Sequence, residues 1–420
     1  MALCVSLSRM AHPILSLWLL VAALAPHACG QWISDHKNQP IRRTSSASLA
    51  FLNNSHFAFS LYRQLVAQNP GRNVLFSPLS FSIPLTLLAL QARPEVRTQI
   101  LKGLGLSRAS VPEKQAPVYY SQQLRSFLPS REECHIDMDS LLFVDLKVTV
   151  VPKFAETAQS LYRTEVFLTS FENEELAKDE MDFFVRKKTH GKIGNLFQEL
   201  DKDTVLVLAN YIFFKGNWRH SFDPSLTVTR PFSVSERLMI PVPMMQRLGR
   251  FQLQRFPDLH SQALRLPYSC NATAVFILPD VGRIRETEEA LMKEDLDTWT
   301  QPFPLRKRKL YFPKFSLPGN VQLDNLLPTI GMSDIFSYHA HLWGISLQTM
   351  PMRVSNAEHR AELTMDEEGA EEADDRDLQA LDKHFLPRLH FNRPFLLLVF
   401  EESSRSLVFL GKVLNPKTEW

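Results

Sequence analysis

The chain has 420 residues, of which 45% are hydrophobic and 10% aromatic, and its 47 Lys and Arg against 45 Asp and Glu give a formal net charge of +2. This apolar content excludes an intrinsically disordered chain, and the balanced charge argues against a nucleic-acid-binding protein, which usually carries a basic excess. Length alone predicts two or three domains of roughly 100–200 residues each.

The first 30 residues have the layout of a secretory signal peptide. Arg9 precedes an apolar stretch from Ile14 to Ala25, and the small residues Ala28 and Gly30 mark a cleavage site before Gln31. The stretch is too short to span a bilayer, and no later segment has the roughly 18 apolar residues that a membrane helix needs. We therefore expect residues 1–30 to be removed and the mature protein to be secreted into the extracellular space, without a membrane partner.

Once the signal peptide is gone, Cys134 and Cys270 are the remaining cysteines. They could form one bridge in an oxidising compartment, but a large domain does not need a disulfide framework, so we expect two separate thiols. Two sequons, at Asn53 and Asn271, predict N-glycosylation, which agrees with export.

The first half of the chain is predicted to be mostly helical after a flexible N-terminal arm over residues 31–54, which are polar and Ser-rich. A helix is expected to begin with Ser55 as its N-cap and to end at the Pro70-Gly71 pair. A largely apolar helix from Pro78 to Leu90 is predicted to be buried. Further helices are expected at Val96 to Leu104, Gln115 to Leu128, Phe154 to Tyr162 and residues 174–188, with strands at Asn73 to Phe76 and Ile136 to Val150.

The second half is predicted to be mostly strand. Val205 to Phe214 is an apolar run of branched and aromatic residues, typical of a central strand that is buried on both faces. Strands are expected up to Pro279, around Leu310 to Leu317, and at Pro394 to Glu401 and Ser406 to Val413, with helices at Glu286 to Trp299 and Leu323 to Ile330. Because no linker or repeat interrupts residues 55–420, we expect one mixed α/β domain there and not a string of modules.

Several segments resemble the serpin family, in its antitrypsin-like secreted branch. The resemblance rests on five stretches that occur in the family's order: Asn73 to Ser80, Thr98 to Gly105, Asn210 to Trp218, His390 to Phe395 and Phe409 to Pro416. It implies a fold of three β-sheets, about nine helices and an exposed reactive loop, which would cover about residues 367–390 here. Family members inhibit serine proteases as suicide substrates: the cleaved loop inserts as a new central strand and carries the acylated protease with it.

The resemblance also assigns roles to single residues. Ser80, Asn210 and His359 fall at the family's shutter, the polar cluster beneath the point where the central sheet opens, and Trp218 falls at the breach above it. Mutual hydrogen bonds would offset the cost of burying these polar groups, so they could equally be purely structural. Counting along the loop from its glycine places the scissile bond at Lys383-His384, and a Lys there would direct a trypsin-like protease.

The hinge that opens the loop departs from the family pattern. Inhibitory serpins follow the glycine with a Thr or Ser, a Glu and then mainly small residues. Here the acidic opening, Gly369 and Ala370 agree, but the next positions are charged. The full hinge reads Glu368, Gly369, Ala370, Glu371, Glu372, Ala373, Asp374, Asp375 and Arg376.

Charge in this hinge opposes insertion, because strand side chains alternate between faces. Insertion sends Glu372, Asp374 and Arg376 to one face, and Glu371, Asp375 and Asp377 to the other. Burying each unpaired ion costs a desolvation free energy of roughly several kcal/mol. The acidic run is then a solvated, mobile loop or, alternatively, a docking site for a basic partner.

We therefore favour a non-inhibitory serpin that binds or carries a small apolar ligand. A trypsin-like protease would cleave this serpin as an ordinary substrate. The alternative is an inhibitor of such a protease, with Lys383 as its specificity residue. The sequence has no zinc spacing, phosphate loop or nucleophile elbow, so we predict no enzyme activity, metal or cofactor. We also expect a monomer without nucleic-acid partners; the basic run from Arg306 to Lys309 reads as a solvated strand edge, with a heparin site as the alternative.

Overall fold

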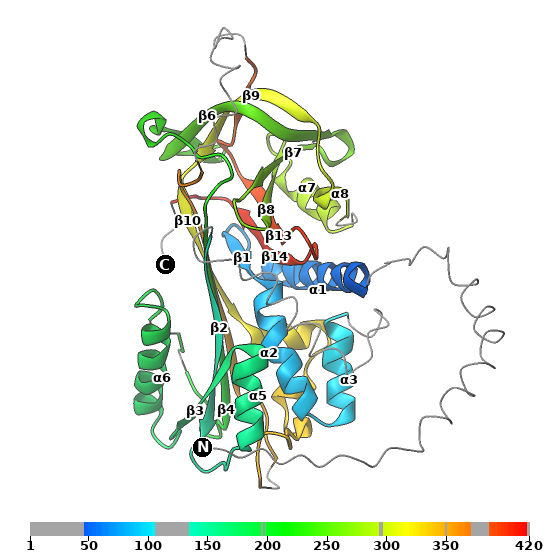
Figure 1. Cartoon of the computed structure of the whole chain (residues 1–420), viewed down its shortest axis with the longest axis vertical. Coiled ribbons are helices and arrows are strands. Elements are labelled where there is room, and N and C mark those ends of the chain that lie inside the picture. Colours follow the sequence, from blue (N-terminus) through cyan, green and yellow to red (C-terminus); the bar gives the residue numbers. More distant parts are fainter. Residues whose placement is uncertain are drawn as a thin grey trace, which may run out of the picture. The chain divides into compact units, whose positions relative to one another are not determined.

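Two hydrogen-bonded β-sheets organise the chain from Ser46 onward (Figure 1). The computed structural model describes residues 46–105, 134–194, 196–197, 199–293, 297–348, 351–370 and 386–417, with side chains from Asn54 onward. The predicted signal peptide lies outside these residues, and so do Glu371 to Arg376, Lys383 and His384.

The smaller sheet has five strands and lies between helices. Its order is β10 (Phe315–Gln322), β11 (Asn356–Met365), β4 (Leu206–Gly216), β2 (Cys134–Asp145) and β3 (Thr164–Thr169). Neighbours β4 and β11 are parallel, as are β2 and β3, whereas β10 with β11 and β2 with β4 are antiparallel. β4 is therefore the centre of this sheet, as its apolar sequence predicted.

The larger sheet has nine strands. In order, it contains β1 (Val74–Phe76), β14 (Leu407–Val413), β13 (Phe395–Glu401), β8 (Ala272–Pro279), β7 (Ser261–Pro267), β6 (Leu238–Phe256), β9 (Leu305–Pro313) and β12 (Arg388–His390), while β5 (Val228–Ser235) pairs with β6. The long strand β6 pairs with β5 and β9 over its first part and with β7 over its last part. The resemblance implied three separate sheets, whereas here β6 joins two of them into one hydrogen-bonded sheet.

Helices cover both faces of the five-stranded sheet. The described α-helices are α1 (Ser46–Gln68), α2 (Pro78–Gln91), α3 (Pro94–Gly103), α5 (Pro152–Tyr162), α6 (Glu174–Lys188), α7 (Ile284–Leu291), α8 (Asp297–Thr300) and α9 (Leu323–Leu326). Figure 1 shows α6 on one side of the sheet and α2, α3 and α5 on the other. No helix among the described residues is long and apolar enough to cross a membrane.

Strand alternation sorts the apolar residues of this sheet into two cores. On β4, Leu208, Ile212 and Phe214 belong to the large core that contains α2. Val207, Tyr211 and Phe213 of the same strand belong to a second core with α6. We call the first side the inner face and the α6 side the outer face.

Most predicted elements are confirmed, with shifts at their ends. α2, α3, α5, α6, β4, β13 and β14 lie where the sequence placed them, whereas the helix predicted at Gln115 to Leu128 lies outside the described residues. The arm boundary at residue 54 is wrong, because α1 begins at Ser46 and not at Ser55. The helix predicted at Glu286 to Trp299 is replaced by α7 and α8, and β3 and β11 had no predicted counterpart.

One buried ion pair joins three elements of the larger core. The Nζ atom of Lys412 on β14 lies 3.1 Å from Oε1 of Glu288 on α7, and their side chains are only 6% and 7% exposed. The hydroxyl of Tyr62 on α1 donates to the same carboxylate at 2.5 Å. Burial, followed by the nearby charge of Glu288, raises the pKa of Tyr62 well above its ordinary value, so Tyr62 stays a donor.

We predict that Lys412→Met lowers the free energy of unfolding by about 3–5 kcal/mol, because it leaves the Glu288 carboxylate buried without a counter-ion. Urea unfolding followed by circular dichroism measures the loss. The double variant Lys412→Met with Glu288→Gln is the matched control and should recover much of the loss, since Gln still accepts from Tyr62. Equal stability of wild type and Lys412→Met would contradict the prediction.

Candidate functional site at the β4 and β11 seam

The parallel pair β4 and β11 forms the line along which a further strand could enter the five-stranded sheet. The two strands pair directly from Val207 with Asn356 to Lys215 with Thr364, so no strand lies between them. We call this line of hydrogen bonds the seam. A chain that leaves the end of β11 and turns back would run antiparallel to both strands, but it could enter only if the seam separated.

The segment that follows β11 is fixed to the residues that follow β4. Trp218 and Gly369 form a parallel bridge, in which the Trp218 amide donates to the Glu368 carbonyl at 2.9 Å and the Ala370 amide donates to the Trp218 carbonyl at 2.9 Å. The indole N–H of Trp218 donates to the Asp366 carbonyl at 2.8 Å. We call the end of the seam at Lys215 and Thr364 its upper end. Backbone contacts therefore close this upper end.

Gly369 is required at this bridge because a side chain would not fit. A Cβ atom there would lie 2.5 Å from the Trp218 carbonyl oxygen and 3.0 Å from the Ser221 Cα atom, both parts of the backbone. The close approach of the two backbones explains why the hinge has a glycine at position 369.

Lysines neutralise the first acids of the segment. Lys215, at the end of β4, lies 2.9 Å from Asp366 and 2.9 Å from Glu368. Glu367 is paired with Lys314 at 2.5 Å and accepts a hydrogen bond from Thr227. Although burial raises the pKa of Glu367, these bonds outweigh burial and lower it below its ordinary value. Sequence reasoning missed both lysines, because nothing local to them indicates their partners.

Ser80, Asn210 and His359 form one hydrogen-bonded cluster on the inner face. The Asn210 Oδ1 atom accepts from the Ser80 hydroxyl at 2.7 Å and lies 2.7 Å from His359 Nδ1. The Ser77 amide donates to His359 Nε2 at 3.0 Å, which leaves Nδ1 as the protonated nitrogen that donates to Asn210. Asn210 also donates to the Ser140 hydroxyl on β2 at 3.0 Å.

This cluster crosses the seam, because Asn210 is on β4 and His359 is on β11. His359 is fully buried, and burial, followed by the charge of Arg360, lowers its pKa to about 3. The imidazole is therefore neutral at pH 7, as its two hydrogen bonds require.

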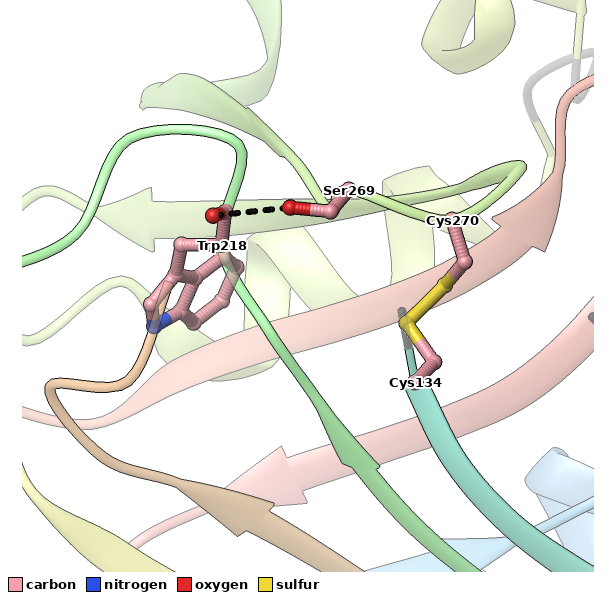
Figure 2. The surroundings of a disulfide bond; sticks show 4 residues. All are labelled: Cys134, Trp218, Ser269 and Cys270. Atoms are coloured by element: carbon pink, nitrogen blue, oxygen red, sulfur yellow. Dashed lines mark hydrogen bonds between the residues drawn. A yellow bond between two sulfur atoms is a disulfide. The ribbon is translucent and has the colours of Figure 1, made fainter. Parts of the chain in front are cut away.

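The structure corrects the prediction of two separate thiols. Cys134 and Cys270 form a disulfide with a Cα separation of 5.9 Å (Figure 2). Cys134 begins β2 beside Gly216 of β4, and Cys270 lies between β7 and β8. Their sequence separation of 136 positions hid this proximity.

The disulfide lies beside Trp218. Figure 2 shows the Ser269 hydroxyl donating to the Trp218 carbonyl, a bond of 3.1 Å. The Trp218 indole stacks on Tyr268 with ring centroids 4.3 Å apart. The upper end of the seam is thus connected covalently, through β2, to the nine-stranded sheet.

The remaining predicted residues lie elsewhere. Asn271 is exposed next to Cys270, and its side-chain nitrogen contacts Glu401 and Ser403. Asn53 lies in α1, but its side chain is outside the described part. Arg306 to Lys309 lie near the start of β9. Among the described strands, Arg306 to Arg308 pair with β6 alone, because β12 pairs with β9 only from Lys309 onward, and the run is exposed or half-buried, as expected for a solvated strand edge. Among the described residues, no group of three His, Cys, Asp or Glu side chains could hold a metal ion.

Comparisons with known proteins match nearly the whole chain. The family model described as Serpin (serine protease inhibitor) matches residues 52–416. Alpha-1-antiproteinase 2 of Equus caballus is 37% identical over 382 residues, which cover 91% of this chain and 89% of that protein. Alpha-1-antitrypsin 1-5 of Mus musculus is 39% identical over 360 residues, which cover 86% and 87%. The structure of human thyroxine-binding globulin in complex with thyroxine matches with a TM-score of 0.81 at 31% identity, covering 89% of this chain and 100% of that one.

We predict that replacing both cysteines by alanine lowers the free energy of unfolding by about 2–5 kcal/mol, because the disulfide closes a long loop in the unfolded chain. Hydrogen exchange should also accelerate at residues 134–136 and 216–218, while the lower half of β4 stays protected. Reduced wild type is the control and should behave like the double variant. Unchanged hydrogen exchange at both segments would contradict the conclusion that the disulfide holds this end of the seam.

We predict that the seam loses stability in acid through His359. Its pKa is about 3 in the folded protein, against 6.5 for the ordinary side chain, so the unfolded chain binds the proton first. The stabilisation is complete above about pH 6.5 and decreases as the pH falls toward 3. His359→Gln should reduce the slope of unfolding free energy against pH between 7 and 4, measured by urea titrations. Equal slopes in both proteins would refute this role.

Proposed function

The chain belongs to the serpin family, and on that premise we propose that it is a non-inhibitory member, a secreted binding or carrier protein for a small apolar ligand. The charged hinge at a closed seam carries this proposal. The protein acts without enzyme activity, as a monomer, and Lys383-His384 is at most a cleavage site for a trypsin-like protease.

The apolar surroundings of the seam support the proposal that inserting the charged hinge would cost a large desolvation free energy. On the inner face, Leu208, Ile212 and Leu363 are completely buried, so charged side chains entering there would lose their water. Alternation sends either Glu372, Asp374 and Arg376 or Glu371, Asp375 and Asp377 to that face. In the first case one Arg can pair with one acid; in the second no counter-ion accompanies the three acids.

The outer face is also unfavourable for further acids. Glu358 on β11 faces this side of the seam beside Ala209, and it is only 7% exposed. Burial raises the pKa of Glu358 to about 8, although Arg360 lowers it in part. A carboxyl already at the seam is therefore held neutral at pH 7, and an inserted Asp or Glu would meet the same desolvation.

Other features support the carrier assignment and secretion. The disulfide between Cys134 and Cys270 suits an oxidising compartment, in agreement with the predicted signal peptide over residues 1–30 and the sequons at Asn53 and Asn271. Likeness to a thyroxine-binding globulin supports a small apolar ligand for this fold. The alternative function, inhibition of a trypsin-like protease through Lys383, is supported by likeness to an antiproteinase.

We predict that cleavage in the loop by trypsin leaves the melting temperature unchanged, because the charged hinge cannot insert. Differential scanning calorimetry of intact and cleaved protein measures this. The control is the triple variant with Glu372, Asp374 and Arg376 replaced by alanine, in which cleavage should raise the melting temperature if the three charges alone block that face. A large rise for the cleaved wild type, or an SDS-resistant complex with trypsin, would overturn the proposal in favour of the inhibitor.

A further inference from the structure

One cavity among the described residues combines an apolar wall with a single partly buried cation. It has a volume of about 480 Å³ and opens between β5, the turn after β8, the start of α7 and the residues before β13. Its apolar wall consists of Val234, Pro279, Val281, Ile284 and Pro394. This volume is within the ~300–1,000 Å³ of cavities that hold drug-sized ligands.

Arg393 supplies the cation. It is half-buried, and its Nε atom donates to the Pro279 carbonyl at 2.9 Å. No carboxylate among the described residues lies within ion-pair distance of it, in contrast to its neighbour Arg255, which binds Asp280 through two hydrogen bonds of 2.8 and 2.6 Å. Burial lowers the pKa of Arg393, although the charge of Asp280 raises it in part, so the guanidinium is incompletely solvated.

The acids around the cavity form no ion pair with Arg393. Asp280 lines the cavity and is paired with Arg255, and its charge raises the pKa of Arg393 in part from beyond ion-pair distance. Glu236 is exposed at the rim and forms no ion pair with a described residue. A ligand carboxylate at Arg393 would therefore supply the direct ion pair that no described carboxylate makes with it, and a guanidinium binds a carboxylate with two parallel hydrogen bonds.

We propose that this cavity binds an apolar carboxylic acid, with its carboxylate at Arg393 and its hydrocarbon body against Val234, Val281 and Ile284. This inference rests on the proposed carrier function, whose ligand class it names. Two larger cavities among the described residues are lined mainly by polar and charged side chains and lack such an apolar wall.

Isothermal titration calorimetry of the full-length, delipidated protein with laurate and with 1-dodecanol tests the ligand class. Laurate should bind with one-to-one stoichiometry and with a dissociation constant about tenfold or more below that of dodecanol, since a hydrogen bond to a charged group contributes about 1.5–3 kcal/mol. Equal affinity for the two probes, or no binding of laurate, overturns the inference.

Variants test the position of the site. Arg393→Gln should abolish the preference for laurate over dodecanol. Val281 is 78% exposed, so Val281→Asp and Val281→Asn should both fold; Asp should weaken laurate binding relative to Asn, while dodecanol should bind both alike. Leu176→Asp, on α6 and 66% exposed, is the control and should bind laurate as wild type does.

The outcomes separate this site from the proposed function. If laurate binds equally to Val281→Asp and Val281→Asn and to Arg393→Gln, the site is wrong, but the non-inhibitory function stands as long as cleavage leaves the melting temperature unchanged. If cleavage stabilises the protein while laurate binding still depends on Arg393, the proposal of a non-inhibitory protein is wrong and the ligand site stands.

Discussion

The parallel pairing of β4 with β11 constrains both the fold and what the chain can do. These strands are far apart in sequence, and their register is fixed on the inner face by a hydrogen bond between Asn210 and His359. The same Asn210 side chain reaches Ser80 on α2 and Ser140 on β2, so one amide connects the seam to a helix and to the next strand. Separating β4 from β11 would break the buried hydrogen bond between Asn210 and His359, which is costly unless a new partner replaces it.

The upper end of the seam is held by contacts of a different kind. Backbone hydrogen bonds at Trp218, ion pairs at Lys215 and the disulfide at Cys134 all lie within a few residues of the end of β4. The ion pairs are partly exposed and are screened by salt, so each is weak by itself. The disulfide is covalent and connects β2 to the other sheet, so the two sheets cannot move apart freely where the chain leaves β11.

The sequence was sufficient where the signal is local and insufficient where it depends on tertiary contacts. β4 was predicted because it is apolar on both faces, and α6 because it is amphipathic and its basic last turn suits the negative end of the helix dipole. β11 was missed although polar and apolar residues alternate along it. His359 interrupts the apolar face, and Ala357 and Ala361 on that face are small, so its apolar signal is weak. The disulfide was misjudged because only the folded chain brings Cys134 to Cys270.

An intact seam and a charged hinge affect the stability of different states of the sheet. Ser80, Asn210 and His359 stabilise the closed sheet, and they would be needed in any protein with this fold, whether or not its sheet ever opens. The seam is closed by direct pairing of β4 with β11, whereas the charges from Glu371 to Asp377 raise the free energy of the state in which the hinge is a strand. A chain can therefore lose insertion through its hinge alone while the rest of the fold keeps its stability. Residues of the closed seam then carry no information about inhibition, and the residues that decide it are those that must enter.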